Sequence, residues 1–440
     1  MSDTPIAAVV LAAGLGSRMR SAVPKHLHAL LGRRMVDWVI RAAEGVEADP
    51  ILVVASPLTS GDFAGVEVAV QETPLGTGDA VRAARTALEG RSEHVLVLSG
   101  DAVLLTDEML RDLIETHRET GAAATVLGIE YDDARHYGRL VRGANGMLER
   151  IVEARDATEQ ERAIREANSA IYVFRSDRLW PTLEQLEPHN AQGELYLTDS
   201  IGLLVAAGET VAVRVAAESF EAGVNTRAEL ADATCVLRDR INLRHMLAGV
   251  TLHDPATTWI EPDVELEPDV TIHPFVILRG RTRVASGAEI HANTVVVDAE
   301  VGTGASLGPF CYLRPGTVLD ASSKAGTFVE IKNSRIGPRG KVPHLSYIGD
   351  AEIGEGTNIG AGAITANFSH TPGRPKSRTR IGKNVRTGVQ NGFIAPVEVG
   401  DGAWTAAGSI ITKDVPPDAL AVARARQENK EGYAARHRDD

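Results

Sequence analysis

Residues 295–319 read VVVDAEVGTGASLGPFCYLRPGTVL, and an aliphatic residue recurs in this stretch at every sixth position. A sustained period of six is typical of a parallel β-helix, in which each hexapeptide forms one flat side of a triangular coil and turns its aliphatic residue inward. A β-sandwich would instead show period-two alternation over longer strands. With one five-residue step, the period is carried by Val264, Val270 and Val276; Val295, Val301, Leu307, Leu313 and Leu319; Ile348, Ile353 and Ile359; and Ile381, Thr387, Phe393, Val399, Thr405 and Ile411.

The repeat and its surroundings divide the chain into parts. We predict a left-handed parallel β-helix of hexapeptide repeats over 251–426, with about nine coils of about eighteen residues, and a flexible polar tail at 427–440. The spacing of Leu230, Ala233, Leu237 and Ile241 predicts a linker helix at 229–250.

The first half of the chain alternates apolar runs with helix-like segments. This alternation favours a Rossmann-like α/β domain at 1–228, with a parallel-rich sheet flanked by helices. Ligands of such folds gather at the carboxyl ends of the strands. The expected strands are 6–11, 51–55, 94–98 and 125–129, and the expected helices are 35–43, 79–88 and 106–120.

Composition and charge narrow the class of protein. The 440 residues include 46 Lys and Arg against 59 Asp and Glu, a formal net charge of −13, which argues against a protein that coats nucleic acid or anionic membranes. Cys235 and Cys311 supply neither a disulfide framework nor a CxxC metal motif, which fits a reducing compartment. The acidic N-terminus lacks the basic region of a signal peptide, and the apolar run at 6–13 is too short to span a bilayer. We therefore expect a cytoplasmic protein with neither a membrane span nor a nucleic-acid partner.

A glycine-rich turn follows the first expected strand. Residues 11–19 read LAAGLGSRM, and Pro24 and Lys25 follow. Such a turn exposes backbone N–H groups that can cradle phosphates, and glycine permits close approach. Arg18 and Lys25 add two cations where a triphosphate would lie. The alternative is a tight turn with two solvated cations.

Two oxygen-bearing side chains are candidate ligands for Mg²⁺. Asp101 follows the apolar strand expected at 94–98, so its carboxylate lies at a carboxyl edge, and Asn225 offers an amide oxygen. Magnesium sites commonly combine one or two such protein ligands with substrate phosphates. The alternative for each residue is a cap at a turn or helix.

Several motifs together resemble known enzymes. The motif LAAGLGSRM with the following PK, PLGTG at 74–78 and SGD at 99–101 resemble the sugar-nucleotidyltransferase superfamily. YGR at 137–139, IVE at 151–153, EAN at 166–168 and GVN at 223–225 are similar to one of its families, the bifunctional N-acetylglucosamine-1-phosphate uridylyltransferases/glucosamine-1-phosphate acetyltransferases. The resemblance covers nearly the whole chain, the β-helix included.

The resemblance assigns roles in the first domain. It implies that Gln71, Gly76 and Thr77 meet the uracil of UTP, that Gly138, Glu153 and Asn168 hold N-acetylglucosamine, and that Arg18 and Lys25 neutralise charge while Mg²⁺ binds Asp101 and Asn225. Ser99 stands where the family often has tyrosine. The implied nucleotide-sugar site comprises Leu11, Ala12, Ala13, Gly14, Lys25, Gln71, Gly76, Thr77, Ser99, Gly100, Gly138, Glu153, Asn168 and Asn225.

In the β-helix, polar residues interrupt the repeat. The resemblance implies that Arg314 and Lys332 bind the phosphate of glucosamine 1-phosphate, that Tyr347 and Asn358 place the sugar, and that His344 is the general base, a task that suits an imidazole near neutral pH. The implied acetyl-CoA site comprises Ala361, Asn367, Phe368, Val389, Ala407 and Arg424. Phe368 replaces a usual tyrosine and Val389 a frequent serine, and each lost hydroxyl removes a hydrogen bond of about 0.5–1.5 kcal/mol. The loop at 369–380 is rich in basic side chains, and it is either a solvated loop or a grip on the phosphates of coenzyme A, with Lys376 at a family lysine position.

These observations predict a bifunctional enzyme. It acetylates glucosamine 1-phosphate with acetyl-CoA and transfers UMP from UTP to N-acetylglucosamine 1-phosphate, which yields the UDP-sugar for peptidoglycan and lipopolysaccharide in bacteria, with pyrophosphate. Because β-helices bring corner side chains together between subunits, we expect a homotrimer. One alternative is a nucleotidyltransferase whose β-helix only regulates or assembles the protein. Another is a non-enzymatic relative, which would be expected to lack the phosphate loop or Asp101.

Overall fold

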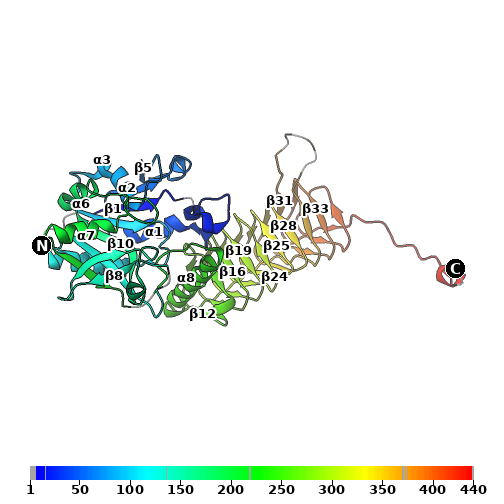
Figure 1. Cartoon of the computed structure of the whole chain (residues 1–440). Coiled ribbons are helices and arrows are strands. Elements are labelled where there is room, and N and C mark those ends of the chain that lie inside the picture. Colours follow the sequence, from blue (N-terminus) through cyan, green and yellow to red (C-terminus); the bar gives the residue numbers. More distant parts are fainter. Residues whose placement is uncertain are drawn as a thin grey trace. The chain divides into compact units, whose positions relative to one another are not determined.

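The computed structural model describes residues 6–14, 16–134, 136–217, 220–368, 371, 373 and 375–438. By their internal contacts the residues form two compact units, Met1–Leu237 and Arg238–Asp440, and each unit is described by itself (Figure 1). The helix α8 (Arg227–Leu247) contributes its first half to the one unit and its second half to the other. Among the described residues, none of the helices is both long and apolar enough to cross a membrane.

The first unit is built on a mixed sheet in the order β11-β7-β10-β6-β1-β4-β5, with the β8–β9 hairpin attached to β10. β1, β4, β5 and β6 run parallel, as expected, whereas β10 is antiparallel to β6 and β7. The strands β5, β8, β9, β10 and β11 are not among those expected from the sequence. The strands of the mixed sheet are β1 (Ile6–Ala12), β4 (Ile51–Ala55), β5 (Glu67–Val70), β6 (His94–Ser99), β7 (Ala124–Glu130), β8 (Arg139–Arg142), β9 (Leu148–Val152), β10 (Glu166–Arg175) and β11 (Val211–Val215). A separate hairpin consists of β2 (Ala29–Leu30) and β3 (Arg33–Arg34).

Helices cover both faces of this sheet (Figure 1). Alternate residues of β1 enter two cores, with Val10 packing with α1 and α4 and Val9 packing with α2, α6 and α7. Side chains of a strand alternate between faces, so a strand buried on both sides reads as the continuous apolar run seen at 6–12. The helices are α1 (Met35–Glu44), α2 (Thr77–Ala83), α3 (Arg85–Leu88), α4 (Asp107–Thr120), α5 (Glu159–Arg162), α6 (Ser176–Leu183) and α7 (Asp199–Ala206), with 3-10 turns η1 (Ser17–Met19), η2 (Lys25–Leu27) and η3 (Ser60–Asp62).

Most expected elements occur within two residues of their predicted bounds. The helix expected at 79–88 is two short helices, α2 and α3, and it starts earlier, at Thr77. The helix expected at 106–120 is α4, whose N-cap is Thr106, because the Thr106 hydroxyl accepts a hydrogen bond from the Met109 amide at 3.2 Å.

The second unit is a left-handed parallel β-helix with three faces, each a stack of short parallel strands (Figure 1). The first face is β12 (Thr251–Leu252), β15 (Thr271–Ile272), β18 (Glu289–Ile290), β21 (Ser306–Leu307), β24 (Lys324–Thr327) and β27 (Lys341–His344), continued by β32 (Arg386–Thr387), β35 (Trp404–Thr405) and β37 (Leu420–Ala421). The second face is β13 (Trp259–Ile260), β16 (Ile277–Arg279), β19 (Val295–Val297), β22 (Tyr312–Leu313), β25 (Glu330–Lys332), β28 (Tyr347–Gly349), β30 (Ile364–Ala366), β33 (Gly392–Ile394) and β36 (Ile410–Ile411). The third face is β14 (Glu265–Leu266), β17 (Arg283–Val284), β20 (Glu300–Val301), β23 (Val318–Leu319), β26 (Arg335–Ile336), β29 (Ala351–Ile353), β31 (Thr379–Ile381) and β34 (Val397–Val399). The unit also contains the 3-10 turn η4 (Pro255–Thr257) and the short helix α9 (Tyr433–Arg436).

The length of a coil is not constant. Ile277 pairs with Val295, and Val295 with Tyr312, which gives rises of 18 and then 17 residues. One coil is longer, because Glu352 pairs with Arg380 and the extra residues form the loop predicted at 369–380. Of that loop, Ser369, His370, Pro372 and Arg374 lie outside the described residues.

The residues that carry the hexapeptide period form the interior of the β-helix, with one exception. Val301, Leu307, Leu313 and Leu319 are at most 2 % exposed. Val295 is half-buried on the outer side, and its neighbour Val296 is fully buried. The expectation for Val295 is therefore wrong by one residue. A 17-residue coil shortens one step of the period to five, and in a run of three valines the letters alone do not reveal where that step falls.

Candidate active sites

The glycine-rich loop after β1 brings two cations to the carboxyl end of the sheet. Gly16 has a left-handed backbone, with φ of 69°, and a Cβ atom on it would lie 2.4 Å from the Cβ of Lys25. Only glycine lets the loop pass this close to Lys25 without a shift. The close packing holds the base of Lys25 against the loop and leaves its ammonium group free to extend toward β6.

Lys25, Asp101, Asn225 and Arg18 form one charged cluster. The Lys25 ammonium makes a short ion pair with Oδ2 of Asp101 and donates to Oδ1 of Asn225 at 3.0 Å. The Arg18 guanidinium donates to the same Asn225 oxygen at 2.9 Å. Ser99 donates from its hydroxyl to Oδ1 of Asp101 and so orients that carboxylate. Residues up to 207 positions apart in sequence therefore meet at the end of β6.

Neither oxygen-bearing residue serves as a helix cap. Helix α4 is capped by Thr106, not by Asp101. At the start of α8, the Glu229 carboxylate accepts from the amides of Asn225 and Thr226, while the Thr226 hydroxyl accepts from the Glu229 amide. Because this reciprocal arrangement satisfies the helix terminus, the side-chain oxygen of Asn225 is free to face Lys25 and Arg18.

A cavity of about 360 Å³ opens beside this cluster. Most of the residues predicted to bind the nucleotide sugar line it, whereas Arg18, Gly138 and Asn225 do not. Asn225 contacts the cavity-lining Lys25, and Arg18 contacts Asn225. Gly138 lies behind Asn168, whose backbone N–H donates to the Gly138 carbonyl at 2.9 Å. The predicted residues in the lining are Leu11, Ala12, Ala13, Gly14, Lys25, Gln71, Gly76, Thr77, Ser99, Gly100, Asp101, Glu153 and Asn168.

One end of the cavity is shaped by the turn into α2. The Gln71 side-chain amide donates to the Gly76 carbonyl at 3.1 Å and to Asp79 at 2.8 Å. Gly76 has a φ of 123°, and a Cβ atom there would lie 2.4 Å from the Leu195 carbonyl oxygen. The Thr77 hydroxyl accepts from the Leu197 amide at 3.0 Å. These contacts hold polar groups at fixed positions, as recognition of a flat base requires.

The other end carries Glu153 and Asn168. Burial raises the pKa of the Glu153 carboxyl above its ordinary value, although the Thr198 hydroxyl, 3.2 Å away, favours the ionised form. Asn168 donates from its side-chain amide to the Tyr172 hydroxyl at 2.7 Å, and its side-chain oxygen accepts from the Ala170 amide. Between Asn168 and Tyr172 the pairing of β10 with β7 shifts register, and such a bulge re-aims side chains beside a site.

On the β-helix, Arg314, Lys332 and Tyr347 share the outer side of the second face. Backbone pairing sets Arg314 beside Lys332 on successive coils, and Lys332 beside Gly349 on the next. Because Gly349 has no side chain, the Tyr347 ring lies across it: a Cβ atom on Gly349 would be 2.5 Å from the Tyr347 hydroxyl. The two cations and the phenol thus occupy one surface, and Arg314 also pairs with Glu330 at 2.8 Å.

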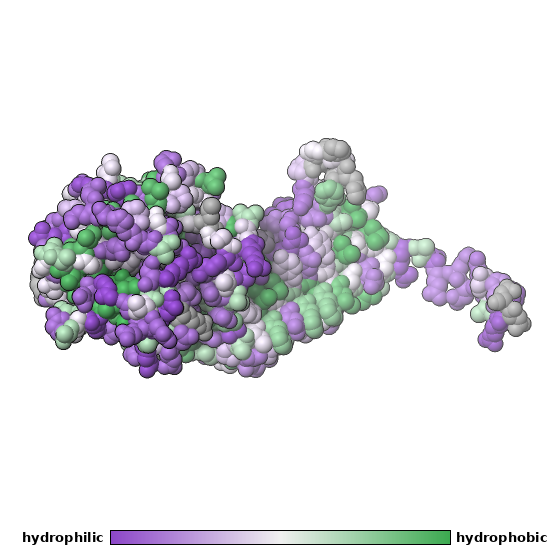
Figure 2. Space-filling model, viewed as in Figure 1, coloured by the Kyte–Doolittle hydropathy of each residue, from purple (hydrophilic) through white to green (hydrophobic). Residues whose placement is uncertain are grey.

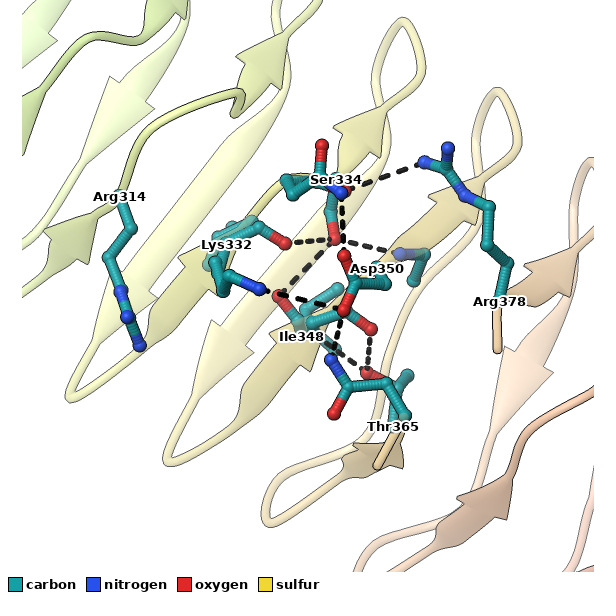
Figure 3. A network of polar contacts seen from close by, with 12 residues as sticks. Arg314, Lys332, Ser334, Ile348, Asp350, Thr365 and Arg378 are labelled. Carbon is teal, nitrogen blue, oxygen red and sulfur yellow. Dashed lines mark hydrogen bonds and ion pairs between the residues drawn. The ribbon is translucent and has the colours of Figure 1, made fainter. Parts of the chain in front are cut away.

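A buried carboxylate supports this surface from behind. Asp350 is 5 % exposed, accepts from Asn333 at 2.6 Å and from Asn367, and lies 3.7 Å from the Lys332 ammonium. Figure 3 shows Lys332 between Arg314 and Asp350, with the Lys332 ammonium turned toward the carboxylate. The pKa of Asp350 lies below its ordinary value: burial raises it, and the two asparagine hydrogen bonds and the lysines outweigh that effect. Lys376 interacts with the same charged residues. Lys332 lowers the pKa of Lys376, and Asp350 acts in the opposite direction without cancelling that effect.

His344 heads a column of residues at the corner between the first and second faces. The His344 carbonyl accepts from the Gly362 amide, the Ala361 carbonyl from Gln390, and the Val389 carbonyl from Gly408. These bonds set His344, Ala361, Val389 and Ala407 on four successive coils, with Arg424 adjoining Gly408. His344, Phe368 and Val389 are exposed, so the predicted general base and most of the predicted acetyl-CoA residues follow a single accessible edge.

The structure does not bring Asn358 to the Arg314 surface within one chain. Asn358 bridges Lys341 and Arg386 on the first face, whereas Arg314, Lys332 and Tyr347 lie on the second. Asn367 is also separate from the exposed column, since it is buried against Asp350.

Comparison with known proteins shows to which family the chain belongs. Residues 8–197 match the model of the MobA-like NTP transferase domain. The bifunctional protein GlmU of Streptomyces avermitilis is 48 % identical over 99 % of this chain and 95 % of its own length, and that of Mycobacterium tuberculosis is 45 % identical over 98 % and 92 %. The chain belongs to the GlmU family. The bifunctional protein GlmU of Kineococcus radiotolerans, at 46 % identity, aligns over a similar extent.

Membership of the GlmU family decides between the alternatives. Relatives described as bifunctional align along both the sheet domain and the β-helix, which confirms the prediction of a bifunctional enzyme, a uridylyltransferase and glucosamine-1-phosphate acetyltransferase, over a single-activity nucleotidyltransferase or a non-enzymatic relative. Nucleotide and acetyl-CoA substrates follow from the family.

Sequence reasoning missed several residues of the first cavity, among them His26, Tyr172, Glu194 and Thr198. The signal in the sequence for His26 is its position directly after the predicted Lys25. Among the residues that the structure describes, the buried Nε2 atom of His26 has no hydrogen-bond partner, and burial together with the Lys25 and Arg34 cations lowers the His26 pKa to about 4. In the GlmU-type domain of this chain, the His26 imidazole therefore lines the cavity in its uncharged form at neutral pH. Tyr172, Glu194 and Thr198 carry no motif of their own.

Proposed function

We propose that the first cavity binds UTP and N-acetylglucosamine 1-phosphate and that its charged cluster promotes uridylyl transfer. Gln71, Gly76 and Thr77 meet the uracil, and Gly138, Glu153 and Asn168 hold the sugar. Arg18 and Lys25 neutralise charge as the sugar phosphate oxygen attacks the α-phosphorus of UTP; the bond to the bridging oxygen breaks and pyrophosphate leaves. No covalent intermediate with the protein is needed, because positioning and electrostatics carry the rate.

The residues present fit a magnesium ion. Oδ2 of Asp101 and Oδ1 of Asn225 both contact one cation, the Lys25 ammonium, so two hard oxygen atoms already converge on a single point, and carboxylate and amide oxygens are the ligands that Mg²⁺ takes. When bound there with substrate, Mg²⁺ would neutralise charge on the phosphates. Lys25 then has to release the two oxygens, and its ammonium becomes available to the triphosphate.

On the β-helix we propose acetyl transfer to glucosamine 1-phosphate. Arg314 and Lys332 bind the phosphate and Tyr347 and Asn358 place the sugar, with Asp350 as a positioning residue for Lys332. His344 accepts the proton of the amine as the amine nitrogen attacks the thioester carbonyl. The C–S bond breaks, and the leaving thiolate of coenzyme A takes that proton from His344 to become a thiol. The cofactor binds along Ala361, Val389, Ala407 and Arg424, with Asn367, Phe368 and Lys376 nearby.

We propose that the protein acts as a homotrimer in the cytoplasm. Asn358 and the Arg314 surface lie on different faces, so a second copy is needed to join them in one site. Bulky apolar residues with left-handed backbones also line the corner between the first and second faces, where Phe275, Phe310, Phe328 and Leu345 are each at least 50 % exposed. Figure 2 shows apolar residues following one another along the β-helix, and exposed rows of this kind mark interaction surfaces.

The two proposed activities belong to separate domains of the chain. We propose a uridylyltransferase domain at 1–228, a linker helix at 229–250, an acetyltransferase domain at 251–426 and a tail at 427–440.

The observation that carries the proposal is the charged cluster beside the cavity, in which Lys25 contacts both Asp101 and Asn225 and Arg18 donates to the same Asn225 oxygen. It is tested by two variants, each assayed for UDP-sugar formation from UTP and N-acetylglucosamine 1-phosphate and for acetyl transfer to glucosamine 1-phosphate. Asp101→Ala should abolish the first reaction and spare the second, and His344→Ala should do the reverse. Asp112→Ala, which removes a surface ion pair with Arg214 at 2.7 Å, serves as the control and should leave both reactions unchanged. If either test variant removed both activities, the assignment of two separate sites would be wrong.

A further inference from the structure

Three histidines follow one another along the first face of the β-helix, whereas the Arg314 surface lies on the second face. His253, His273 and His291 each come directly after the inward residue of a strand, and those inward residues, Leu252, Ile272 and Ile290, are paired in register. The rings are accordingly close: centroids of His253 and His273 are 4.5 Å apart, and those of His273 and His291 are 5.0 Å apart.

A carboxylate completes this group. Glu289 precedes His291 by two residues and points to the same side of the strand. Its Oε1 lies 2.9 Å from Nε2 of His273 and 3.7 Å from Nδ1 of His291. One ligand atom of each of the three residues lies within 4.8 Å of the others. The side chains are 25 %, 31 % and 47 % exposed for His273, His291 and Glu289, so an ion in solution can reach them.

The spacing suits a small transition-metal ion. Ligand atoms about 2.0–2.2 Å from a tetrahedral ion are about 3.4 Å from each other, and the two observed nitrogen–oxygen distances lie on either side of that value. Nε2 of His291 is 3.3 Å from the Ser306 hydroxyl on the next coil. If Nε2 carries the proton and donates to Ser306, Nδ1 is left unprotonated on the side of Glu289. Metal-binding histidines generally have such a partner on the other ring nitrogen.

We propose that His273, Glu289 and His291 form a binding site for one borderline divalent transition-metal ion such as Zn²⁺. Two imidazoles and one carboxylate favour such an ion over Mg²⁺, which prefers oxygen ligands. The ion joins β15 to β18 and thereby links two successive coils near the start of the β-helix. The exposed His253 meets the His273 ring edge-on, and water supplies the remaining coordination.

The site is tested on untagged full-length protein freed of metal with a chelator and held in excess Mg²⁺, so that oxygen-ligand sites are saturated. Co²⁺ is titrated while its visible absorption bands are recorded, and Zn²⁺ affinity is measured by competition with a chromophoric chelator. We expect one ion per chain and loss of at least tenfold in affinity for His273→Ala, His291→Ala and the nearly isosteric Glu289→Gln.

His189→Ala is the matched control, because the exposed His189 pairs with Glu187 at 2.9 Å. It should bind as the unmodified chain does. Circular dichroism and the two transferase assays show that the variants are folded. Unchanged Zn²⁺ affinity in the three test variants, or absorption bands of an ion bound only by oxygen, would refute the site and leave His273 and Glu289 as an ordinary ion pair.

Discussion

The neutral imidazole of His26 leads to a quantitative prediction. His26 is 3 % exposed, its ring stacks on Phe63 with centroids 5.8 Å apart, and burial, Lys25 and Arg34 lower its pKa from 6.5 to about 4. As pH falls, the unfolded chain takes up a proton at this histidine before the folded chain does. The contribution of His26 to stability is therefore fully present above pH 6.5 and is lost progressively until the pH reaches about 4.

The size of the effect follows from the two pKa values. Between about pH 7.5 and about pH 5, the difference in proton uptake removes about 2 kcal/mol from the free energy of unfolding. The His26 imidazole also hydrogen-bonds to the Gly14 backbone. His26→Asn removes the titrating group and keeps a side-chain N–H donor. Other buried histidines titrate in the same direction, since the pKa of His117 is lowered to about 3. Only the difference between variant and unmodified chain isolates His26.

Hydrogen exchange in strand β1 is a suitable measurement, because β1 is paired on both sides and such an interior strand exchanges through opening of its own unit. After correction for the intrinsic pH dependence of exchange, protection of β1 should fall about 30-fold more in the unmodified chain than in His26→Asn between about pH 7.5 and about pH 5. The variant is expected to be less stable than the unmodified chain at the higher pH, since it loses the contact with Phe63. Equal losses of protection in the two proteins would refute the argument that burial keeps His26 neutral.

Three further changes probe other parts of the chain. Gly76→Ala places a Cβ atom 2.4 Å from the Leu195 carbonyl at a φ of 123°; strain of about 1–3 kcal/mol should raise the KM for UTP about tenfold or more in steady-state assays, with acetyl transfer unchanged. Phe393→Ala removes a fully buried ring from the β-helix interior and should cost about 3–5 kcal/mol, seen by calorimetry as a lower melting temperature of that unit; an unchanged melting temperature would show that the interior tolerates the cavity. Phe368→Tyr restores a hydroxyl at an exposed position and should tighten acetyl-CoA binding by about 0.5–1.5 kcal/mol in isothermal titration calorimetry.

Local patterns in the sequence were sufficient to predict much of the fold and part of the candidate site. The period of six predicts the β-helix because most inward positions of a coil are small or aliphatic, and Val301, Leu307 and Leu313 are buried accordingly. The glycine-rich turn after an apolar strand predicts the place of Lys25, because strand and turn are contiguous. Local patterns did not predict the inward residue at Val295 or the strand β10. The five-residue step at Val295 and the antiparallel pairing of β10 both depend on neighbours that are distant in sequence.

Local patterns in the sequence indicate which side chains are available and, for most of the candidate residues, on which element each one lies. The tertiary structure alone decided which of them meet. Asn225 reaches Lys25 across 200 positions because α8 begins at the end of the sheet where η2 lies, and no local pattern encodes that approach. The three histidines of the first face are 20 and 18 residues apart, close to the length of a coil, yet only the registered stacking of β12, β15 and β18 shows that their rings touch. A period fixes the direction in which a side chain points; the contact partners are fixed by the packing of distant segments.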